Sequence, residues 1–596
     1  MKLNNIYCLL IGVLLLAITA PGCTKELEQS AVSTATKPAV FGSEDGLKLY
    51  SLSFYDMLPS ISTPYKTDVD LSDYGAISSA PDYVREGAYS SRQSSGWDWD
   101  KLRNVNYFIV NCTNPSVPED VRNNYLGLAR FFRAYFYFDK MVRFGDVPWY
   151  GKPLNIGDTA LLYKGRDPRV LIMDSIVADL DFAAANIKAW DDPTRSTITK
   201  SVVFGFKSRV CLFEGTFRKY QTSFKLTGSA DKYLQLAADA ADSVMASGKY
   251  GLNTAGDQPY RNLFISEAPV ATEVMLADVS SVSLAKFNDA NWYFTSATYG
   301  RRFSFTRTFI NTFLNIDGTP FTDKVGHETM VFADEVKNRD LRLQQTIRMG
   351  GYQRITGGNK IPAPPTFSYT YTGYMPIKWS LDDMYYDGGT LNTNSVPLMR
   401  YAEILLNYAE AKAELGKLTN QDWIKTIGAL RGRAGITGGL DQLPVKVDPY
   451  MQKNYFPDIS DPVIMEIRRE RGIELTLEGF RMDDLIRWKH GELLTKPWNG
   501  FYVPALNKPM DLNGDGIMDV CFYTTMPSDK ITGVTYVNVS KEPQTLEHGT
   551  YGELEWLSNI PRVWKSYQYL YPIPYEDIQV NSNLKQNPGW EEQPAP

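Results

Sequence analysis

The stretch NNYLGLARFFRAYFYFDKMVRFGDVPWY, residues 123–150, decides the fold class of this chain of 596 residues. Its apolar residues recur at intervals of three and four positions, which is the period of an amphipathic helix. Gly145 and Pro148 follow the periodic part, and these residue types end helices. We therefore predict a long helix that stops at the turn formed by residues 145–148.

Five further stretches have the same helical period. They are residues 168–187, 199–220, 230–250, 396–418 and 461–491, the last of which is interrupted at Gly479. The predicted helices fall in pairs, with small and aromatic residues at packing positions, although no regular repeat length is present. Paired helices of this kind are typical of tetratricopeptide-like repeats, which stack to bury a shared core.

Two long stretches have a different composition. Residues 251–395 and 497–570 are rich in Gly, Pro, Asn, Tyr and Thr, with short alternating runs such as VTYVNV. Such segments form loops and small hairpins. We therefore predict a mostly α fold, with a tetratricopeptide-like helical-repeat scaffold over residues 43–250 and 396–491 and long loop-rich, β-hairpin insertions over 251–395 and 497–570.

The N-terminus indicates export. The apolar run over residues 6–19 is too short to span a membrane, which takes about 20 apolar residues, and it is typical of a signal peptide. APGC at residues 20–23 resembles the cleavage and acylation site of bacterial lipoproteins, although Pro21 departs from the usual small residue. We predict a lipoprotein signal peptide over residues 1–22, lipidation of Cys23 and a tether over residues 23–42. An ordinary cleaved signal peptide is the alternative.

Composition excludes several classes of protein. The net charge is −6 and 22% of residues are charged, so no basic field favours nucleic acid or anionic lipid. The three histidines are scattered, which argues against a His-based metal site or triad. Cys112, Cys211 and Cys521 are the cysteines that follow Cys23, so at most one disulfide is expected. Cys211 lies in an apolar segment and is expected to be a buried thiol.

Aromatic residues make up 13% of the chain, including 37 Tyr and 12 Trp. Flat aromatic faces with a polar edge suit sugar rings, because the ring C–H groups pack on the face while the hydroxyls find polar partners. A large core with many surface tyrosines explains the same composition equally well. The excess therefore favours glycan binding without establishing it.

Several of the helical segments resemble one family, the SusD/RagB proteins. The matching motifs are LARFFRAYFYFDKMVRFGDVPW (128–149), PLMRYAEILLNYAEAKAELG (397–416), LRGRAGI (430–436), RRERGIELTLEGFRMDDLIRW (468–488) and YLYPIPYEDIQVNSNLKQNPGW (569–590). They follow in the family's order, and the resemblance covers residues 43–596. Gly428 departs from the asparagine that the family often has there.

The resemblance implies an outer-membrane lipoprotein, lipid-anchored and facing the cell exterior. Proteins of this family capture glycans and sit as a lid on a SusC-like TonB-dependent importer, so the implied partners are that receptor, a glycan and the membrane. The implied function is non-catalytic capture of oligosaccharide or polysaccharide for import, with no required cofactor. The alternatives are a lid or interaction subunit with a peptide or other non-glycan ligand, and, less favoured, a surface glycosidase.

The segment ERGIELTLEGFR, residues 470–481, carries three acids on one helix face, at Glu470, Glu474 and Glu478. A glycosidase needs two carboxylates that flank the sugar from opposite sides, about 5–9 Å apart, and acids along one helix face do not provide this. Arginines are interleaved with the acids at positions 468, 469, 471, 481 and 487. We therefore predict a structural ion-pair network.

A Ca²⁺-binding loop is suggested by DLNGDGIMD, residues 511–519. Alternating oxygen ligands followed by a glycine resemble an EF-hand-like loop. The candidate ligands are Asp511, Asn513, Asp515, Ile517 through its backbone, and Asp519. The EF-hand glutamate and flanking helices are missing, so a turn without metal is the alternative. Bound Ca²⁺ would stiffen the loop and take no part in chemistry.

The resemblance also implies where a glycan binds. In the family a tryptophan ahead of the helix that begins near residue 100 often stacks on the glycan, with polar residues of the preceding loop nearby, and a later loop adds further aromatics. The matching residues are Trp97, Trp99, Asn104, Asp73, Tyr74, Tyr83 and Arg85 in the first region, and Trp292, Tyr293 and Tyr299 in the second. Packing or ordinary surface exposure is the alternative for each.

Overall fold

The computed structural model describes residues 37–591. The predicted signal peptide, Cys23 and most of the predicted tether lie outside this range. Among the described residues, no helix combines the length and the apolar character needed to cross a bilayer.

Helices dominate the architecture. Those of eight or more residues are α4 (Glu44–Ser51), α5 (Thr63–Asp70), α6 (Asp100–Asn111), α7 (Glu119–Phe144), α9 (Arg169–Asn186), α10 (Lys200–Tyr220), α11 (Ala230–Ala246), α17 (Tyr401–Glu414), α21 (Pro462–Glu474) and α22 (Arg481–Trp488). The shorter ones are α3 (Lys37–Phe41), α8 (Thr159–Leu162), α12 (Asn262–Ile265), α13 (Ala290–Thr295), α14 (Arg307–Ile310), α15 (Phe332–Glu335), α16 (Leu343–Thr346), α18 (Asn420–Trp423), α19 (Ala429–Arg433), α20 (Pro449–Asn454) and α23 (Tyr575–Val580).

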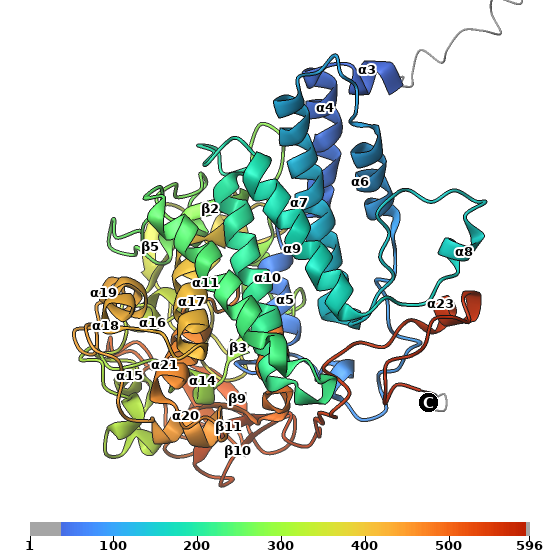
Figure 1. Ribbon diagram of the computed structural model, residues 1–596. Coiled ribbons are helices and arrows are strands. Elements are labelled where there is room, and N and C mark those ends of the chain that lie inside the picture. Colours follow the sequence, from blue (N-terminus) through green and yellow to red (C-terminus); the bar gives the residue numbers. More distant parts are fainter. Residues whose placement is uncertain (1–36, 592–596) are drawn as a thin grey trace, which may run out of the picture.

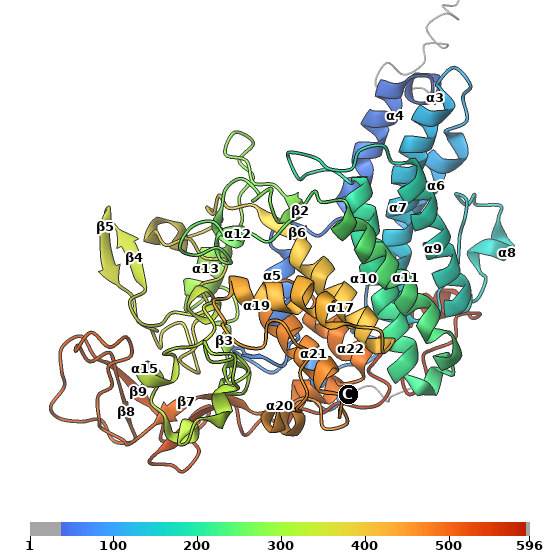
Figure 2. The same ribbon diagram turned by 60° about the vertical axis from the view of Figure 1, so that its left-hand side comes forward.

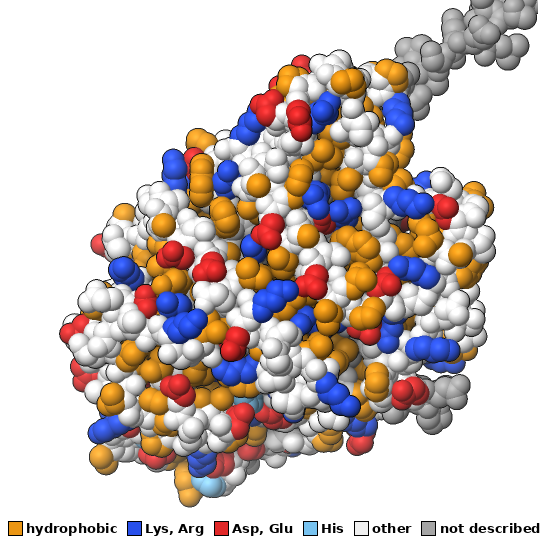
Figure 3. Space-filling view, viewed as in Figure 1, with side chains coloured by type: hydrophobic (Ala, Val, Ile, Leu, Met, Phe, Trp, Pro, Cys, Tyr) orange, Lys and Arg blue, Asp and Glu red, His pale blue; other side chains and the backbone are white. Residues whose placement is uncertain are grey.

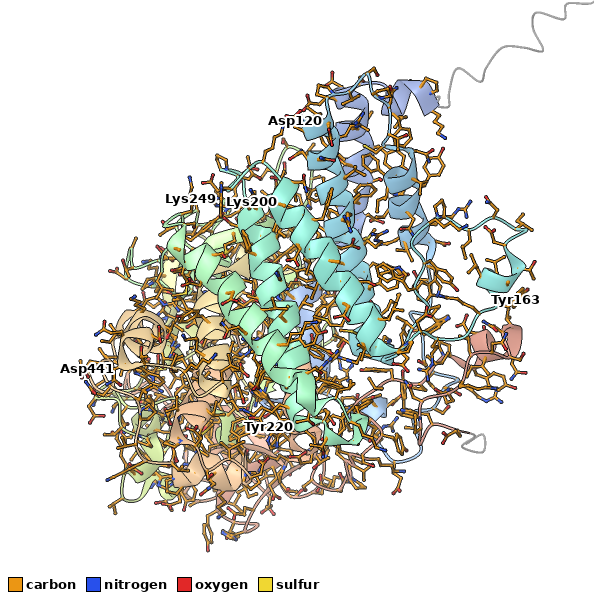
Figure 4. The ribbon with its side chains drawn as sticks, viewed as in Figure 1. Asp120, Tyr163, Lys200, Tyr220, Lys249 and Asp441 are labelled. Atoms are coloured by element: carbon orange, nitrogen blue, oxygen red, sulfur yellow. The ribbon has the colours of Figure 1, made fainter. Side chains whose placement is uncertain are left out.

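The long helices stack in pairs. Helix α7 packs on α9, α10 on α11, α11 on α17, and α17 on α21, so that each pair buries one face against the next. Figure 1 shows α9, α10, α11 and α17 side by side across the molecule. In Figure 4, Lys200 and Lys249 mark the same end of the α10–α11 pair and Tyr220 the other end, so the two helices are antiparallel. This stacking is the helical-repeat scaffold that the sequence predicts.

The ends of the helices follow local sequence signals. Gly145 ends α7 with φ of 77°, a conformation that glycine adopts without steric cost, and its N–H donates to the carbonyl of Met141. Gly479, with φ of 86°, separates α21 from α22 as predicted. Thr199 caps α10, because its side chain accepts from the N–H of Val202.

The predicted helix over residues 396–418 is wrong in its first part. Val396–Arg400 form strand β6, which pairs antiparallel with β2, and the helix begins only at Tyr401. Pro397 lacks an N–H and restricts the residue before it to extended backbone. Pairing with a strand more than a hundred residues away therefore overrides the helical pattern.

The strands are short and lie mostly in the insertions. They are β1 (Gly75–Ala76), β2 (Val274–Asp278), β3 (Ser304–Phe305), β4 (Gln353–Thr356), β5 (Asn359–Pro362), β6 (Val396–Arg400), β7 (Trp498–Val503), β8 (Val520–Tyr523), β9 (Thr535–Asn538), β10 (Gln544–Leu546) and β11 (Gly552–Trp556). Strands β4 and β5 form a hairpin, and β10, β11 and β7 form an antiparallel sheet. The two insertions share one hydrophobic core, in which Phe305, Trp379 and Phe501 are fully buried. Figure 2 shows this part beside the stacked helices.

The cysteines follow the prediction. Cys112, Cys211 and Cys521 are buried free thiols. Burial raises the pKa of Cys211 to about 12, so the thiol is held neutral and unreactive.

Candidate functional site

A cavity of about 300 Å³ lies where α6 begins, beside the segment that follows α7 and beside α23. It is lined by Trp97, Trp99, Asp100, Leu102, Arg103, Asn106, Pro148, Tyr150, Lys152, Pro153, Leu154, Leu162, Lys164, Asp577, Val580, Asn581 and Leu584. We call it the tryptophan cavity. Figure 1 shows α6, α8 and α23, the helices around it, on one side of the molecule.

Two tryptophans form one wall of this cavity. The rings of Trp97 and Trp99 lie edge to face, with centroids 5.5 Å apart. Trp97 packs against Phe144 at the end of α7, and Trp99 lies edge to face with Tyr150 at 5.6 Å. Both tryptophans are half-buried, so each presents part of its ring to the cavity.

Hydrogen bonds hold this wall in place. Lys140 Nζ donates to the carbonyl of Gly96 at 2.6 Å and fixes the loop just before Trp97. Asn106 Nδ2 donates to the carbonyl of Tyr150 at 2.7 Å, which ties α6 to the opposite wall. Because these hydrogen bonds tie the loop before α6 and the segment after α7 to the two helices, the aromatic rings are preorganised for a ligand.

Charged and amide groups surround the aromatic wall. Lys164 Nζ donates to the carbonyl of Trp149 at 2.9 Å, and Asn581 Nδ2 donates to the carbonyl of Lys164 at 3.0 Å. Burial, reinforced by the charge of Glu576, raises the pKa of Asp577. Apolar ring faces beside hydrogen-bonding groups suit a ligand with one apolar face and a polar edge.

A second aromatic group lies on α13 and the loop after it. Trp292 and Tyr299 stack with ring centroids 3.7 Å apart, and Tyr293 packs edge to face on Tyr299. Lys66 Nζ forms an ion pair with Asp289 at 2.6 Å, and Asp289 also accepts from Tyr299 Oη. Trp292 and Tyr299 are half-buried, so the stacked pair is partly exposed to solvent. Figure 2 shows α13 on one side of the molecule and α6 on the other, so the structure does not bring the two aromatic groups together.

The other residues predicted in the first region do not line the tryptophan cavity. The Asp73 carboxylate is buried and forms an ion pair with Arg481, with Nε and Oδ1 2.6 Å apart. Tyr74 is 1% exposed and Tyr83 is 5% exposed, so both belong to the core. Their hydroxyls donate to Asp68 and to the carbonyl of Gln568, respectively.

Arg85 and Asn104 are also held by neighbours. Arg85 is exposed and pairs with Asp82, three residues earlier. Asn104 lies on the side of α6 that faces α4, where Oδ1 accepts from Tyr50 Oη at 2.6 Å and Nδ2 donates to Ser53 Oγ at 2.8 Å. Of the residues predicted for this region, the structure places Trp97 and Trp99 in the tryptophan cavity.

The acids of α21 and the turn after it form a buried ion-pair network, as predicted. Glu474 pairs with Arg342, Arg400 and Arg433. Burial opposes ionisation of Glu474, but the three guanidinium groups outweigh it and hold its pKa well below the ordinary value. Glu478 pairs with Lys378 at 2.6 Å.

The cations of this network are not the interleaved arginines that the sequence suggested. They come from segments distant in the chain, and the interleaved arginines pair elsewhere, as Arg471 does with Asp484 and Arg487 with Glu410. Helix α21 therefore joins the helical scaffold to the insertions on several sides.

The loop over residues 511–519 is held by its own hydrogen bonds. Both carboxylate oxygens of Asp511 accept backbone N–H groups, from Asn513, Gly514 and Gly516. Asp519 Oδ2 accepts from the N–H of Leu512 at 2.7 Å. Within residues 37–591, no three His, Cys, Asp or Glu side chains are grouped as metal ligands would be. A bound Ca²⁺ would have to draw these oxygens together.

Sequence reasoning missed the far wall of the tryptophan cavity. Tyr150, Lys152 and Lys164 follow α7, and Asp577 and Asn581 come from α23 and its end, more than four hundred residues later. Figure 4 labels Tyr163 at the end of α8, near α23. The C-terminal motif was a signal that this segment matters, but no local pattern showed that it packs beside Trp97.

The distribution of charged side chains on the surface agrees with the charge composition of the sequence. On the face drawn in Figure 3, Lys and Arg side chains are interspersed with Asp and Glu, and no single-sign field covers it. This face offers no broad basic surface for nucleic acid.

Comparison with known proteins identifies the family to which the chain is similar. Its residues 278–590 match the sequence model of the SusD family. The SusD-like protein P38 of Formosa agariphila is 24% identical over 439 residues, covering 67% of this chain and 74% of that protein. Among solved structures, a SusD-like protein from Bacteroides fragilis aligns over 92% of this chain and 98% of the solved chain, with 21% identity and a TM-score of 0.65.

A SusD-like carbohydrate-binding protein from Bacteroides fragilis also aligns over 92% of this chain and 100% of the solved chain, with 19% identity and a TM-score of 0.66. At this level of identity the two structures establish the fold, and they bear out the predicted mostly helical architecture with its tetratricopeptide-like scaffold. The family model matches more than half of the chain, including most of the first insertion, all of the second and the C-terminal motif. This chain belongs to the SusD family.

Proposed function

We propose that this protein is a non-catalytic, glycan-binding lipoprotein of the outer cell surface. It captures oligosaccharide or polysaccharide and passes it to a SusC-like TonB-dependent importer. Family membership supports this function, and so does the structural similarity to a protein described as carbohydrate-binding. The N-terminal sequence, with Cys23 as the lipidated residue, supports the anchoring.

The tryptophan cavity is the single observation that carries the proposal. Its two tryptophans and Tyr150 supply aromatic surface, while Lys152, Lys164 and Asn581 supply hydrogen-bonding groups at its edge. Sugar rings need both, because their C–H faces pack on aromatic rings and their hydroxyls need polar partners. Weak binding, with Kd from about 1 μM to 1 mM, corresponds to roughly 4–8 kcal/mol.

The state of the buried acids supports a non-catalytic role. Catalysis by a glycosidase needs a carboxyl group with a raised pKa facing a carboxylate across the substrate. Glu470 and Glu474 are instead buried and paired with arginines from other segments. This acidic motif is therefore used to hold the fold together.

The stacked pair of Trp292 and Tyr299 forms a second aromatic surface for glycan stacking. The pair is partly exposed and lies on another side of the molecule from the tryptophan cavity. Its aromatic surface would extend the contact of a long polysaccharide, whereas a short oligosaccharide would occupy one site at a time.

The test is affinity electrophoresis of residues 24–596 against a panel of polysaccharides, followed by calorimetry with the glycan that retards the protein. Trp97→Ala and Trp99→Ala are expected to weaken binding at least tenfold. Trp292→Ala tests whether the stacked pair of Trp292 and Tyr299 also contacts the glycan. Trp190→Ala is the matched control, because Trp190 is 38% exposed and lies outside both aromatic groups. Unchanged binding in the Trp97 and Trp99 variants would move the site elsewhere, and no binding to any glycan would favour a peptide ligand or a lid-only role.

A further inference from the structure

A cavity of about 340 Å³ lies where α5, α7, α10 and α22 meet. We call it the α22 cavity. Figure 2 shows α5, α10 and α22 near the middle of the molecule, between α13 on one side and α6 on the other. The α22 cavity shares no lining residue with the tryptophan cavity, so it is a separate site.

Three oxygen-bearing side chains line the α22 cavity close to one another. Tyr135 and Asp139 are four residues apart on α7, so they lie on one face of that helix. Asp483 joins them from α22. Burial is the main reason that the pKa of Tyr135 is raised to about 12, and the charges of Asp139 and Asp483 add to it. Only nearby charges act on a pKa in this way, so the three groups are neighbours.

The oxygen atoms of these groups are accessible and largely without partners. Among the described residues, neither the Asp483 carboxylate nor the Tyr135 hydroxyl forms a hydrogen bond or an ion pair. Both side chains are half-buried, and their oxygen atoms keep accessible surface. Asp139 is exposed, and Lys140 Nζ lies 3.9 Å from its Oδ2 while donating to the carbonyl of Gly96. A ligand can therefore reach all three groups.

The arginines that line the α22 cavity are held by other groups. Arg209 binds Glu403 through Nε at 2.6 Å and through Nη2 at 2.7 Å. Arg143 Nε donates to the carbonyl of Ser95 at 3.1 Å, and its guanidinium lies 4.1 Å from the ring centroid of Tyr571. Neither arginine pairs with the two aspartates, which leaves their negative charge for a ligand.

The arrangement does not suit a metal ion. Glu478, the third acid of the wall, is already paired with Lys378 at 2.6 Å and with Arg400 at 2.7 Å. Calcium takes six to eight oxygen ligands, and in the described part of the chain no three His, Cys, Asp or Glu side chains are grouped as metal ligands. Pro59 and Phe480 make part of the wall apolar. A primary ammonium group fits better, because it has three N–H donors and is attached to a carbon body.

We propose that the α22 cavity binds the primary ammonium group of a small organic amine. Asp139 and Asp483 supply the opposite charge, and Tyr135 Oη accepts a further hydrogen bond. The carbon body of the amine packs on Pro59 and Phe480. The volume lies within the range of about 300–1,000 Å³ that is usual for small-molecule pockets. Amino sugars and aliphatic diamines both carry this group, and the site acts independently of glycan capture by the tryptophan cavity.

The test is isothermal titration calorimetry of residues 24–596 at about pH 7.5, where Asp483 is mostly ionised. A salt concentration of about 0.15 M screens the exposed charges. The probes are putrescine and diglucosamine, and their uncharged counterparts are butanediol and di-N-acetylglucosamine. We expect at least one amine to bind, and Asp483→Asn and Asp139→Asn each to weaken that binding at least tenfold. Any binding of the uncharged counterparts should be unaffected by these substitutions.

Asp120→Asn is the matched control. Asp120 is an exposed acid on the same helix as Asp139, it pairs with Lys188, and it lies outside the α22 cavity. This variant should bind the amines as the wild type does. Tighter binding of diglucosamine than of putrescine would identify the ligand as an amino sugar, and the reverse order would identify it as an aliphatic amine.

Two results would overturn the inference. One is that the wild-type chain binds neither amine, and the other is that amine binding survives both Asp483→Asn and Asp139→Asn. Both variants keep the shape of the side chain and remove only its charge, so misfolding does not confuse the result. A wild-type chain that binds the amines but no polysaccharide would refute the proposed function and leave this inference standing.

Discussion

Arg481 Nε and Asp73 Oδ1 lie 2.6 Å apart, in an ion pair that joins residues 408 positions apart in the chain. A second bond, from Nη2 to Oδ2 at 2.8 Å, makes the pair bidentate. Both side chains are buried. The pair therefore ties the loop before β1 to the start of α22.

Replacement of Asp73 tests whether the residue is structural. Asp73→Ala leaves the buried guanidinium of Arg481 without its partner, which typically destabilises a protein by about 3–5 kcal/mol. We expect the midpoint of urea unfolding to fall, while glycan binding by the folded fraction is unchanged. Asp82→Ala, which removes an exposed partner of Arg85, is the control and should change stability by less than about 1 kcal/mol. Loss of binding at unchanged stability would restore Asp73 to the glycan site.

Asp483 makes stability depend on pH. Burial and then the negative charges of Asp484 and Asp139 raise the pKa of Asp483 to about 7. A carboxyl whose pKa is raised in the folded state stabilises the protein below its unfolded pKa of about 4, and this contribution is lost as the pH rises to about 7. We expect Asp483→Asn to stabilise the protein by roughly 1–3 kcal/mol at pH 8, since one pKa unit corresponds to about 1.4 kcal/mol. At pH 4 it should have little effect.

The contribution of Glu410 to stability depends on pH in the opposite direction and serves as the comparison. Burial opposes its ionisation, but the guanidinium of Arg487 outweighs this effect and lowers the pKa to about 2. Its contribution to stability is therefore complete above about pH 5 and is lost as the pH falls towards 2. Glu410→Gln should be destabilising at pH 7 and much less so near pH 2. Parallel pH profiles for Glu410→Gln and Asp483→Asn would contradict both assignments.

Calcium binding by residues 511–519 is tested by thermal unfolding with Ca²⁺ or EDTA. Burial, together with the charges of Asp511 and Asp515, raises the pKa of Asp519, so a cation would relieve repulsion in this loop. We expect millimolar Ca²⁺ to raise the Tm by a few degrees, as binding to the folded state requires. Asp519→Asn should abolish that rise. Equal Tm values with Ca²⁺ and EDTA would favour a turn without metal.

The end of α7 positions one wall of the tryptophan cavity. A Cβ at Gly145 would lie 2.8 Å from Leu570 Cδ1, and φ of 77° disfavours any other residue. Gly145→Ala is expected to destabilise the protein by about 1–3 kcal/mol. It should also weaken glycan binding, because Trp97 packs on Phe144. Gly157→Ala, which has open space around it, is the control. Similar stabilities for the two variants would show that the helix end tolerates a side chain.

The sequence by itself determined most of the long helices, the stops at Gly145 and Gly479 and the family. Apolar periodicity and the two glycines Gly145 and Gly479 act within a few residues of where they stand, so local reasoning recovers them. The structural role of Glu470, Glu474 and Glu478 was also predictable, because their spacing on one helix face argued against catalysis.

Only the tertiary structure decided which residues meet. Residues 396–400 became a strand because β2 lies beside them, and the acids of α21 pair with Arg342 and Arg400 from other segments. The tryptophan cavity is closed by α23, whereas α13, which carries Trp292, lies on another side of the molecule. The physical reason is that a helical period specifies which face of an element is buried, but the partner of that face is selected by packing across the whole chain.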